Sequence, residues 1–120
     1  MKVGIADTTF SRIDLGKIAI DELRRYAGLR YERYTVPGIK DLPIAAKKLI
    51  EEKGCDIVVT LGWVGGTQKD MLSYVVLSMG LVMLQLMTNK HVIDVTIHED
   101  EAEDEKELLR VAENRVREHV

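Results

Sequence analysis

The feature that most constrains the fold is an uninterrupted apolar run in the middle of the chain. The stretch Asp56-Ile-Val-Val-Thr-Leu61 is almost entirely aliphatic, and Gly62 closes it. A strand with one solvent-exposed face alternates apolar and polar residues, whereas a strand that is buried on both faces does not. The run therefore predicts a strand of a parallel sheet with helices on both sides.

The rest of the chain alternates in the same way between strand-like and helical patterns. Strands are predicted at residues 2–6, 30–36, 56–61 and 91–97. Helices are predicted at about residues 12–27, 42–53, 69–88 and 101–119. Because crossovers between parallel strands are right-handed, we expect an α/β fold, a flavodoxin-like three-layer sandwich with strand order 2-1-3-4.

Length and charge narrow the class of protein. The 120 residues suit a single domain, 1–120, and the net charge of −3 with scattered basic residues predicts no nucleic-acid partner. The one cysteine, Cys55, is expected to be a buried structural thiol in a reducing compartment. Charged residues interrupt the first 20 positions, so no signal peptide is predicted and we expect a cytoplasmic protein.

One predicted helix is abnormal because it carries no charge. The seventeen residues from Met71 to Met87 are uncharged, which is close to the lower limit of length for a membrane span. Gly80 and Gln85 weaken that interpretation. A helix that is apolar all round is more often buried between a sheet and a neighbouring subunit, so we expect a homo-oligomer and no membrane span.

A proline-glycine bend marks the first candidate binding site. The predicted strand that ends at Val36 is followed by Pro37 and Gly38, and a glycine can take a φ that is closed to other residues. Asp41 is placed to cap the next helix, with Pro43 in its first turn. Ligands of α/β proteins bind beyond the carboxyl ends of strands, although an ordinary turn would have the same pattern.

Other candidates lie in the loops that this topology gathers at the same edge. Phe10 falls in a loop, where it could stack on a flat heterocycle or serve as a hydrophobic staple for the first helix. The glycine-rich stretch from Gly62 to Thr67 lets backbone approach a ligand but lacks the spacing of a nucleotide-binding loop. The residues are thus typical of an oligomeric small-molecule site for a planar, polar ligand.

Ionisable side chains supply candidates for chemistry at this edge. Lys69, Asp70 and His98 are the predicted proton-transfer groups, provided that they converge. Glu99, Asp100 and Glu103 could hold a hard cation, but such an acidic run is more often a solvated helix start. We therefore assign no metal ligand.

The chain resembles the archaeal riboflavin synthases, a branch of the lumazine synthase superfamily. The stretches that carry this resemblance are Val3–Arg12, Tyr34–Pro43, Glu52–Val58, Gln85–His91 and His98–Ala102. The resemblance implies a flavodoxin-like subunit, a homopentamer and sites shared between neighbours. It also implies that two 6,7-dimethyl-8-ribityllumazine molecules exchange a four-carbon unit, giving riboflavin and 5-amino-6-ribitylamino-uracil. Magnesium is associated with these enzymes, and no organic cofactor is expected.

The resemblance also implies roles for individual residues. Phe10 matches the aromatic residue that stacks on the heterocycle, and Asp41 matches a carboxylate that takes ribityl hydroxyls. Gly38, Ile39 and Lys40 match the loop whose backbone holds the pyrimidinedione and the ribityl chain. Ser11 and Gly62 complete the predicted substrate-binding set.

Departures from the family pattern keep two alternatives open. The phosphate grip of lumazine synthases, an Arg-Gly pair followed by His, is missing from residues 65–69, which favours the dismutation over lumazine synthesis. Val75 and Val76 stand where the family has a His-Glu pair, and the family's further C-terminal helix is not expected in residues 1–120. The alternatives are therefore a lumazine synthase and a non-catalytic assembly or flavin-binding subunit.

Overall fold

The computed structural model describes residues 1–11, 13–26, 28–65, 68–99 and 105–119. The strands in this part of the chain are β1 (Lys2–Thr8), β2 (Arg30–Val36), β3 (Ile57–Val64) and β4 (Val92–His98). The helices are α1 (Leu15–Leu23), η1 (Ile39–Asp41), α2 (Leu42–Glu51), α3 (Gln68–Thr88) and α4 (Glu105–His119), where η1 is a single 3-10 turn.

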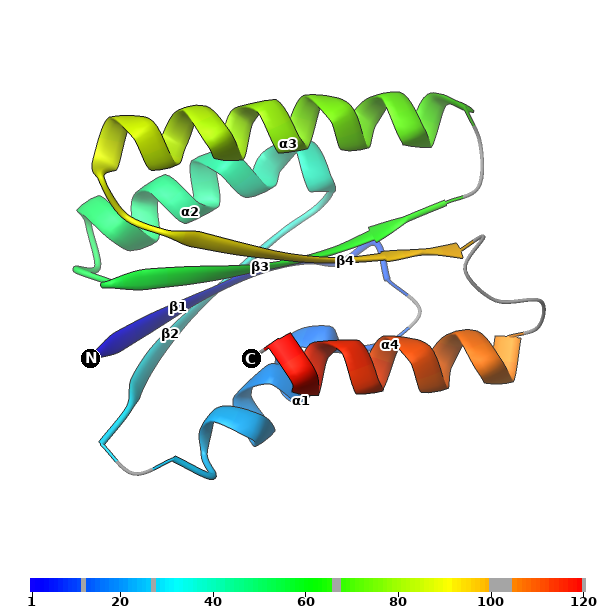
Figure 1. Ribbon diagram of the computed structural model, residues 1–120, viewed down its shortest axis with the longest axis horizontal. Coiled ribbons are helices and arrows are strands. Elements are labelled where there is room, and N and C mark those ends of the chain that lie inside the picture. The colour runs from blue at the N-terminus through cyan, green and yellow to red at the C-terminus, as the bar shows by residue number, and fades with distance from the viewer. Residues whose placement is uncertain (12, 27, 66–67, 100–104, 120) are drawn as a thin grey trace.

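The strands form one parallel sheet of order β2-β1-β3-β4, which confirms the predicted fold class and strand order. Helices α2 and α3 cover one face of the sheet, and α1 and α4 cover the other (Figure 1). Each face has its own apolar core, one around Leu42, Leu49 and Leu77 and the other around Ile5 and Trp63. The result is the three-layer sandwich that the apolar run predicts.

The third strand runs past the point where the sequence predicts its end. Gly62, Trp63 and Val64 were expected in a loop, but they pair with residues 96–98 of β4 and belong to β3. The prediction was wrong because the partner that extends the strand lies more than thirty positions away in the sequence. Trp63 is only 1% exposed, so the extension also buries the one tryptophan of the chain.

The first helix is shorter than predicted at both ends. Asp14 caps α1, because its side chain accepts a hydrogen bond from the Lys17 backbone N–H at 3.0 Å. The helix ends at Leu23, before Gly28, which has a φ of +84° and cannot continue a helix. Residues 12 and 27, at the predicted ends, lie outside the described residues.

Helix α3 is apolar on its outer side as well as on its inner side. Leu77, Leu81 and Leu84 are buried in the core beside α2. The exposed apolar side chains of α3 are Met71, Leu72, Val75, Val76, Met79, Val82, Met83, Leu86 and Met87. By length and composition this helix could cross a membrane, and only 17% of its apolar 18-residue window is buried within the chain. Its outer row is a contiguous apolar surface of the kind that marks an interaction site.

A buried carboxylate ties the first helix to the sheet. Asp7 of β1 is 3% exposed, and Arg33 of β2 donates to its Oδ2 from Nη2 at 2.5 Å. The same Nη2 donates to Asp14 at 2.7 Å, and Thr35 donates to Oδ1 of Asp7 at 2.7 Å. The pKa of Asp14 is lowered: burial opposes this, but the Lys17 N–H and Arg33 favour the charged form. These bonds link β1, β2 and the start of α1.

Cys55 is buried, as the sequence predicts. Its side chain lies in the core of the α2 and α3 face and is 1% exposed. Burial raises the pKa of its thiol, which opposes formation of the reactive thiolate.

The close approach of α1 to this ion pair predicts the effect of a small substitution. A Cβ on Gly16 would lie 2.5 Å from Asp7 Oδ2 and 2.7 Å from Arg33 Cζ. We expect Gly16→Ala to lower the free energy of unfolding by about 1–3 kcal/mol, because the helix or the ion pair must shift. Urea denaturation at a fixed protein concentration measures the change.

Gly38→Ala is the matched control. A Cβ on Gly38 would meet nothing within 4 Å, and its φ of −144° is open to alanine. This variant is expected to keep wild-type stability within about 0.5 kcal/mol. Equal stability of the two variants would show that a glycine at position 16 is not needed for the close packing of α1 against the Asp7–Arg33 ion pair.

Candidate functional site

Four segments meet in a small cavity at the carboxyl edge of the sheet. The cavity has a volume of about 140 Å³ and is lined by Phe10, Ile39, Lys40, Trp63, Val64, Asp70 and Ser73. These residues come from the loop after β1, from η1, from the end of β3 and from the start of α3. We call this space the edge cavity. It lies where the topology predicts a ligand site, beyond the ends of parallel strands.

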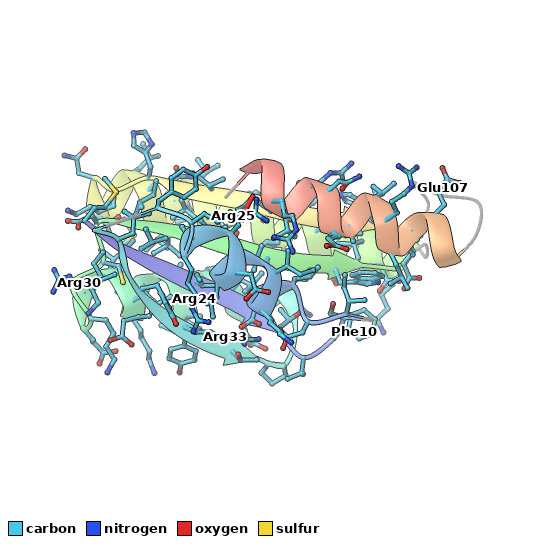
Figure 2. The ribbon with its side chains drawn as sticks, turned by 90° about the horizontal axis from the view of Figure 1, so that it is seen from below. Phe10, Arg24, Arg25, Arg30, Arg33 and Glu107 are labelled. Atoms are coloured by element: carbon cyan, nitrogen blue, oxygen red, sulfur yellow. The ribbon has the colours of Figure 1, made fainter. Side chains whose placement is uncertain are left out.

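Phe10 is presented to the edge cavity instead of being packed in a core. Its side chain is 56% exposed, and Figure 2 shows it at the end of the molecule toward which the strands run. The Thr8 hydroxyl donates to the Phe10 carbonyl at 3.2 Å, which fixes the backbone of this loop. The exposure contradicts the hydrophobic-staple interpretation and leaves a ring face available for stacking.

The proline-glycine bend holds its shape through Asp41. The Gly38 N–H donates to Asp41 Oδ2 at 3.2 Å, and the Asp41 N–H donates to the Gly38 carbonyl at 3.0 Å. Asp41 precedes α2, as predicted, but its side chain makes no helix-cap bond. The expected special φ of Gly38 was wrong, since −144° is extended backbone. Ile39 and Lys40 of this bend line the edge cavity, whereas Gly38 and Asp41 do not.

Two other predicted substrate-binding residues have local structural contacts. Gly62 lies within β3, where an added Cβ would be 3.3 Å from Ile39 Cγ2 and 3.4 Å from Thr96 Oγ1. It therefore lets Ile39 pack against the strand, and it does not line the edge cavity. The Ser11 hydroxyl donates to the Ile13 carbonyl at 2.5 Å, beside Phe10.

The three predicted proton-transfer residues do not share one cavity. Asp70 lines the edge cavity, and its carboxylate lies so close to Gly65 that a Cβ there would be 2.5 Å from Oδ2. His98 ends β4, where its ring and the ring of Tyr74 make a T-shaped contact with a centroid distance of 4.8 Å. Lys69 is exposed at the start of α3. The roles of the three residues stay predictions, and Asp70 has the geometry that fits best.

Sequence reasoning missed Trp63, which lines the edge cavity from β3. Its Nε1–H donates to Glu99 Oε1 at 2.8 Å, so the indole is fixed at the sheet edge. A signal was present, because Trp63 is the one tryptophan of the chain, but the sequence analysis placed it in a loop. Glu99 is thus a hydrogen-bond acceptor for Trp63.

Sequence reasoning also missed a partly buried carboxylate on β4. Asp94 Oδ1 accepts hydrogen bonds from the hydroxyls of Thr60 at 2.9 Å and Thr96 at 3.0 Å. Burial raises the pKa of Asp94, while the two threonines, the charge of His98 and the Tyr74 hydroxyl act in the opposite direction. The network connects β3, β4 and α3.

No group of three or more His, Cys, Asp and Glu side chains that could hold a metal occurs within the described ranges. Two members of the acidic run considered from the sequence, Asp100 and Glu103, lie outside those ranges. None of the chemistry below is derived through a metal.

The sequence of the chain matches one protein family over its whole length. Residues 1–120 match the family described as 6,7-dimethyl-8-ribityllumazine synthase. The chain belongs to this family.

Its relatives include proteins named riboflavin synthase. The protein of that name from Archaeoglobus fulgidus is 86% identical over 120 residues, which are 100% of this chain and 78% of the relative. The one from Methanothermobacter thermautotrophicus is 55% identical over 99% of this chain and 78% of the relative. The one from Aeropyrum pernix is 55% identical over 98% of this chain and 76% of the relative. The resemblance drawn from the sequence motifs is confirmed.

Within this lumazine synthase family, the departures of the chain can now be located. Val75 and Val76, at the position of the family's His-Glu pair, are 53% and 56% exposed on α3. They do not line the edge cavity. Residues 66 and 67 of the loop that lacks the phosphate grip lie outside the described ranges.

The partly buried Asp94 predicts a pH dependence of stability. A folded-state pKa above the ordinary 3.8 means that the folded chain binds more protons than the unfolded chain in the pH range above 3.8. The favourable effect of protonation is thus complete below 3.8 and is lost as the pH rises through the folded pKa. An asparagine keeps an acceptor for both threonines and carries no charge. We expect Asp94→Asn to be more stable relative to wild type at pH 7 than at pH 4, as measured by urea denaturation.

Asp56→Asn is the control of opposite sign. The Lys2 N–H donates to Asp56 at 2.8 Å and lowers its pKa, so its contribution is present above 3.8 and is lost as the pH falls. This variant is expected to fall further below wild type at pH 7 than at pH 3, which is below the ordinary pKa of 3.8. A parallel pH response of the two variants would contradict the assignment of a raised pKa to Asp94.

Proposed function

We propose that the protein is a riboflavin synthase, which converts two 6,7-dimethyl-8-ribityllumazine molecules into riboflavin and 5-amino-6-ribitylamino-uracil. The observation that carries the proposal is the 86% identity, over the whole chain, to a protein named riboflavin synthase. The edge cavity supports it, because an exposed phenylalanine and the bend of η1 line the same space. A neutral ring with a polyol chain needs stacking and directed hydrogen bonds more than it needs charge.

Phe10 is proposed to stack on the heterocycle, with Ser11 beside it in the same loop. Backbone groups of Gly38, Ile39 and Lys40 are proposed to bind the pyrimidinedione and the ribityl chain. Asp41 already orders this bend through the Gly38 N–H. In this proposal Asp41 acts both as an acceptor for ribityl hydroxyls and as the residue that holds the loop in place. Gly62 contributes by letting Ile39 pack closely on β3.

The reaction needs no external oxidant or reductant, because the atoms of two lumazines equal those of the two products. The 7-methyl group of one lumazine is acidic, and the carbanion formed from it attacks the second molecule. The four-carbon unit leaves one molecule as it joins the other. The work of the protein is then to align two rings and to move protons, both of which accelerate such a reaction strongly.

Proton movement is proposed to involve Asp70, Lys69 and His98. Asp70 has the most direct support, since it lines the edge cavity together with Phe10. Lys69 precedes it at the start of α3, and His98 lies at the end of β4. A histidine changes charge near neutral pH, which suits a group that takes up and returns a proton.

The apolar outer row of α3 supports a homo-oligomer, with a closed pentameric ring as the proposed form. A shallow groove of about 280 Å³ runs beside this row and is lined in part by Pro43, Gly80 and Met87. A second copy of the chain is the proposed occupant, because it would cover the exposed methionines and leucines of α3. A cytoplasmic location and an association with magnesium remain predictions from the sequence and the resemblance.

One assay separates this function from the two alternatives. Purified protein incubated with 6,7-dimethyl-8-ribityllumazine and magnesium is expected to form riboflavin, followed by its fluorescence. A lumazine synthase would instead consume a four-carbon phosphate and 5-amino-6-ribitylamino-uracil. Binding of lumazine without either reaction would favour the remaining alternative, a non-catalytic subunit. That alternative was raised because Val75 and Val76 replace the His-Glu pair of the family.

Phe10→Ala is the internal control of the assay. Loss of a stacked ring is expected to weaken lumazine binding about tenfold, which corresponds to about 1.4 kcal/mol. The assembly state should not change, because Phe10 lies in the loop after β1 and is not part of the outer row of α3. Unaltered lumazine affinity would remove Phe10 from the site.

Charge on the outer row of α3 is expected to break the assembly. Leu86 is 80% exposed in the isolated chain, so Leu86→Lys should fold but should place an unpaired cation in the subunit interface. Association is expected to weaken at least tenfold, as seen by sedimentation velocity, with unchanged circular dichroism. Tyr26→Lys, an exposed aromatic residue just beyond α1 on the other face, is the control and should sediment as wild type. Identical sedimentation of both variants would show that α3 does not form the interface.

A further inference from the structure

A polar row crosses the sheet face that α3 covers (Figure 1). Asp94, Thr96 and His98 alternate along β4, so they point to the same face of the sheet. His98 is the register partner of Val64, which lines the edge cavity from β3. Neighbouring strands lie about 4.8 Å apart, so the backbone of His98 is one strand away from the wall of the cavity.

Tyr74 of α3 contacts both ends of this row. Its hydroxyl donates a hydrogen bond to the carboxylate of Asp94, and its ring makes the T-shaped contact with His98. The hydroxyls of Thr60 and Thr96 donate to Oδ1 of the same carboxylate at 2.9 Å and 3.0 Å. Neutral donors therefore hold the carboxylate, and the tyrosine that binds it also supports one side of the imidazole.

The charge of Asp94 has an unusual environment. In the part of the chain that the structure describes, no arginine or lysine forms an ion pair with Asp94. The charged group that acts on it is His98. Burial of a carboxylate without a cationic partner is unfavourable, and an asparagine would accept the same bonds without that cost. A residue that is costly for stability in this way is typical of a functional site.

Other charged groups near His98 have contacts of their own. Glu99 follows on the opposite face of the sheet, where it accepts the tryptophan N–H at 2.8 Å. Arg115 donates to a carbonyl of β4 from α4, which covers that opposite face. Asp70, in the first turn of α3, lies against the glycine that follows β3. Asp94 is the carboxylate that shares both a sheet face and a tyrosine contact with His98.

We propose that Asp94 is a positioning residue, which orients His98 through Tyr74 and balances the charge that His98 gains when it removes a proton from the 7-methyl group of the lumazine. The C–H bond breaks, its electron pair stays on the carbon as the carbanion, and the proton passes to a ring nitrogen of His98. The carboxylate stabilises the imidazolium until the proton is returned. A base that is oriented by a third group is a recurring arrangement in enzymes. This inference rests on the proposed function for its substrate.

Asp94→Asn tests the role of the charge, because the amide oxygen still accepts bonds from the two threonines. In the riboflavin assay at pH 7, kcat is expected to fall about tenfold or more, with KM within about twofold of wild type, since the lost interaction forms only during the reaction. The urea midpoint at pH 7 is expected to stay at or above that of wild type. A purely structural role would instead lower the midpoint together with the activity.

Asp56→Asn is the matched control. Asp56 is exposed just before β3, at the opposite edge of the sheet, and accepts the Lys2 N–H at 2.8 Å. Its kcat is expected to stay within about twofold of wild type. Asp94→Ser is the second neutral variant if Asp94→Asn does not assemble. Unchanged kcat in an assembled neutral variant at position 94 would overturn the proposal.

Modification by diethyl pyrocarbonate tests the coupling of Asp94 to His98 without turnover. The reagent acylates neutral imidazole, and peptide mass spectrometry separates His98 from the exposed His91, whose rate should not change. At pH 6, His98 is expected to react about threefold faster in Asp94→Asn than in wild type, because loss of the carboxylate favours the neutral ring. At pH 8, above the ordinary pKa of histidine, the two rates should agree. The ratio of the rates at the two pH values removes any difference in exposure.

The two measurements allow the two proposals to fail separately. Equal rate ratios in wild type and Asp94→Asn would contradict the coupling, whatever the activity of the variant. A wild-type protein that forms no riboflavin would contradict the proposed function, whereas the modification rates would still decide whether the carboxylate acts on His98.

Discussion

The pairing of β3 with β4 beyond Gly62 is the constraint on which the site depends. Because Val64 pairs with His98, the sheet continues far enough to bring Trp63 to its carboxyl edge. The loop of Phe10, the bend after β2 and the start of α3 reach the same edge because the sheet is parallel throughout. Had β3 stopped at Leu61, Trp63 would lie in a loop and would not line the edge cavity in this way.

The architecture could be predicted because burial on both faces leaves a strong pattern. The aliphatic run of β3 and the alternation of elements are local properties, and right-handed crossovers restrict the strand order to very few choices. Element ends were less predictable because they depend on distant partners. The extension of β3 needs β4, and the start of α1 is set by Asp14, which both caps the helix and accepts a bond from Arg33 of β2. Such partners are not visible in a local window of sequence.

The site was predictable where topology alone decides position. Phe10, Ile39, Lys40 and Asp70 follow strand ends, and they do line one cavity. Features that depend on side-chain direction or on local backbone angles were not predictable in the same way. Examples are the contact of His98 with Tyr74 and the φ of Gly38. Asp94 had a signal that could have been used. It shares one face of its strand with Thr96 and His98 at a spacing of two residues, and a lone carboxylate on such a face requires hydrogen-bond donors.

One contact in this fold lies between the proposed subunit interface and the proposed ligand loop. Gly80 of α3 has no side chain, which lets Pro43 of α2 pack closely against it. A Cβ added to Gly80 would lie only 2.9 Å from Pro43 Cγ. Pro43 follows directly on the bend that Asp41 holds closed, and the groove beside α3 includes both Pro43 and Gly80. In the proposed homo-oligomer, a neighbouring subunit that covers the outer row of α3 would therefore lie against the helix that begins at the proposed ligand loop. The exposed apolar side chains of α3 and the bend before α2 thus belong to one continuous packing arrangement.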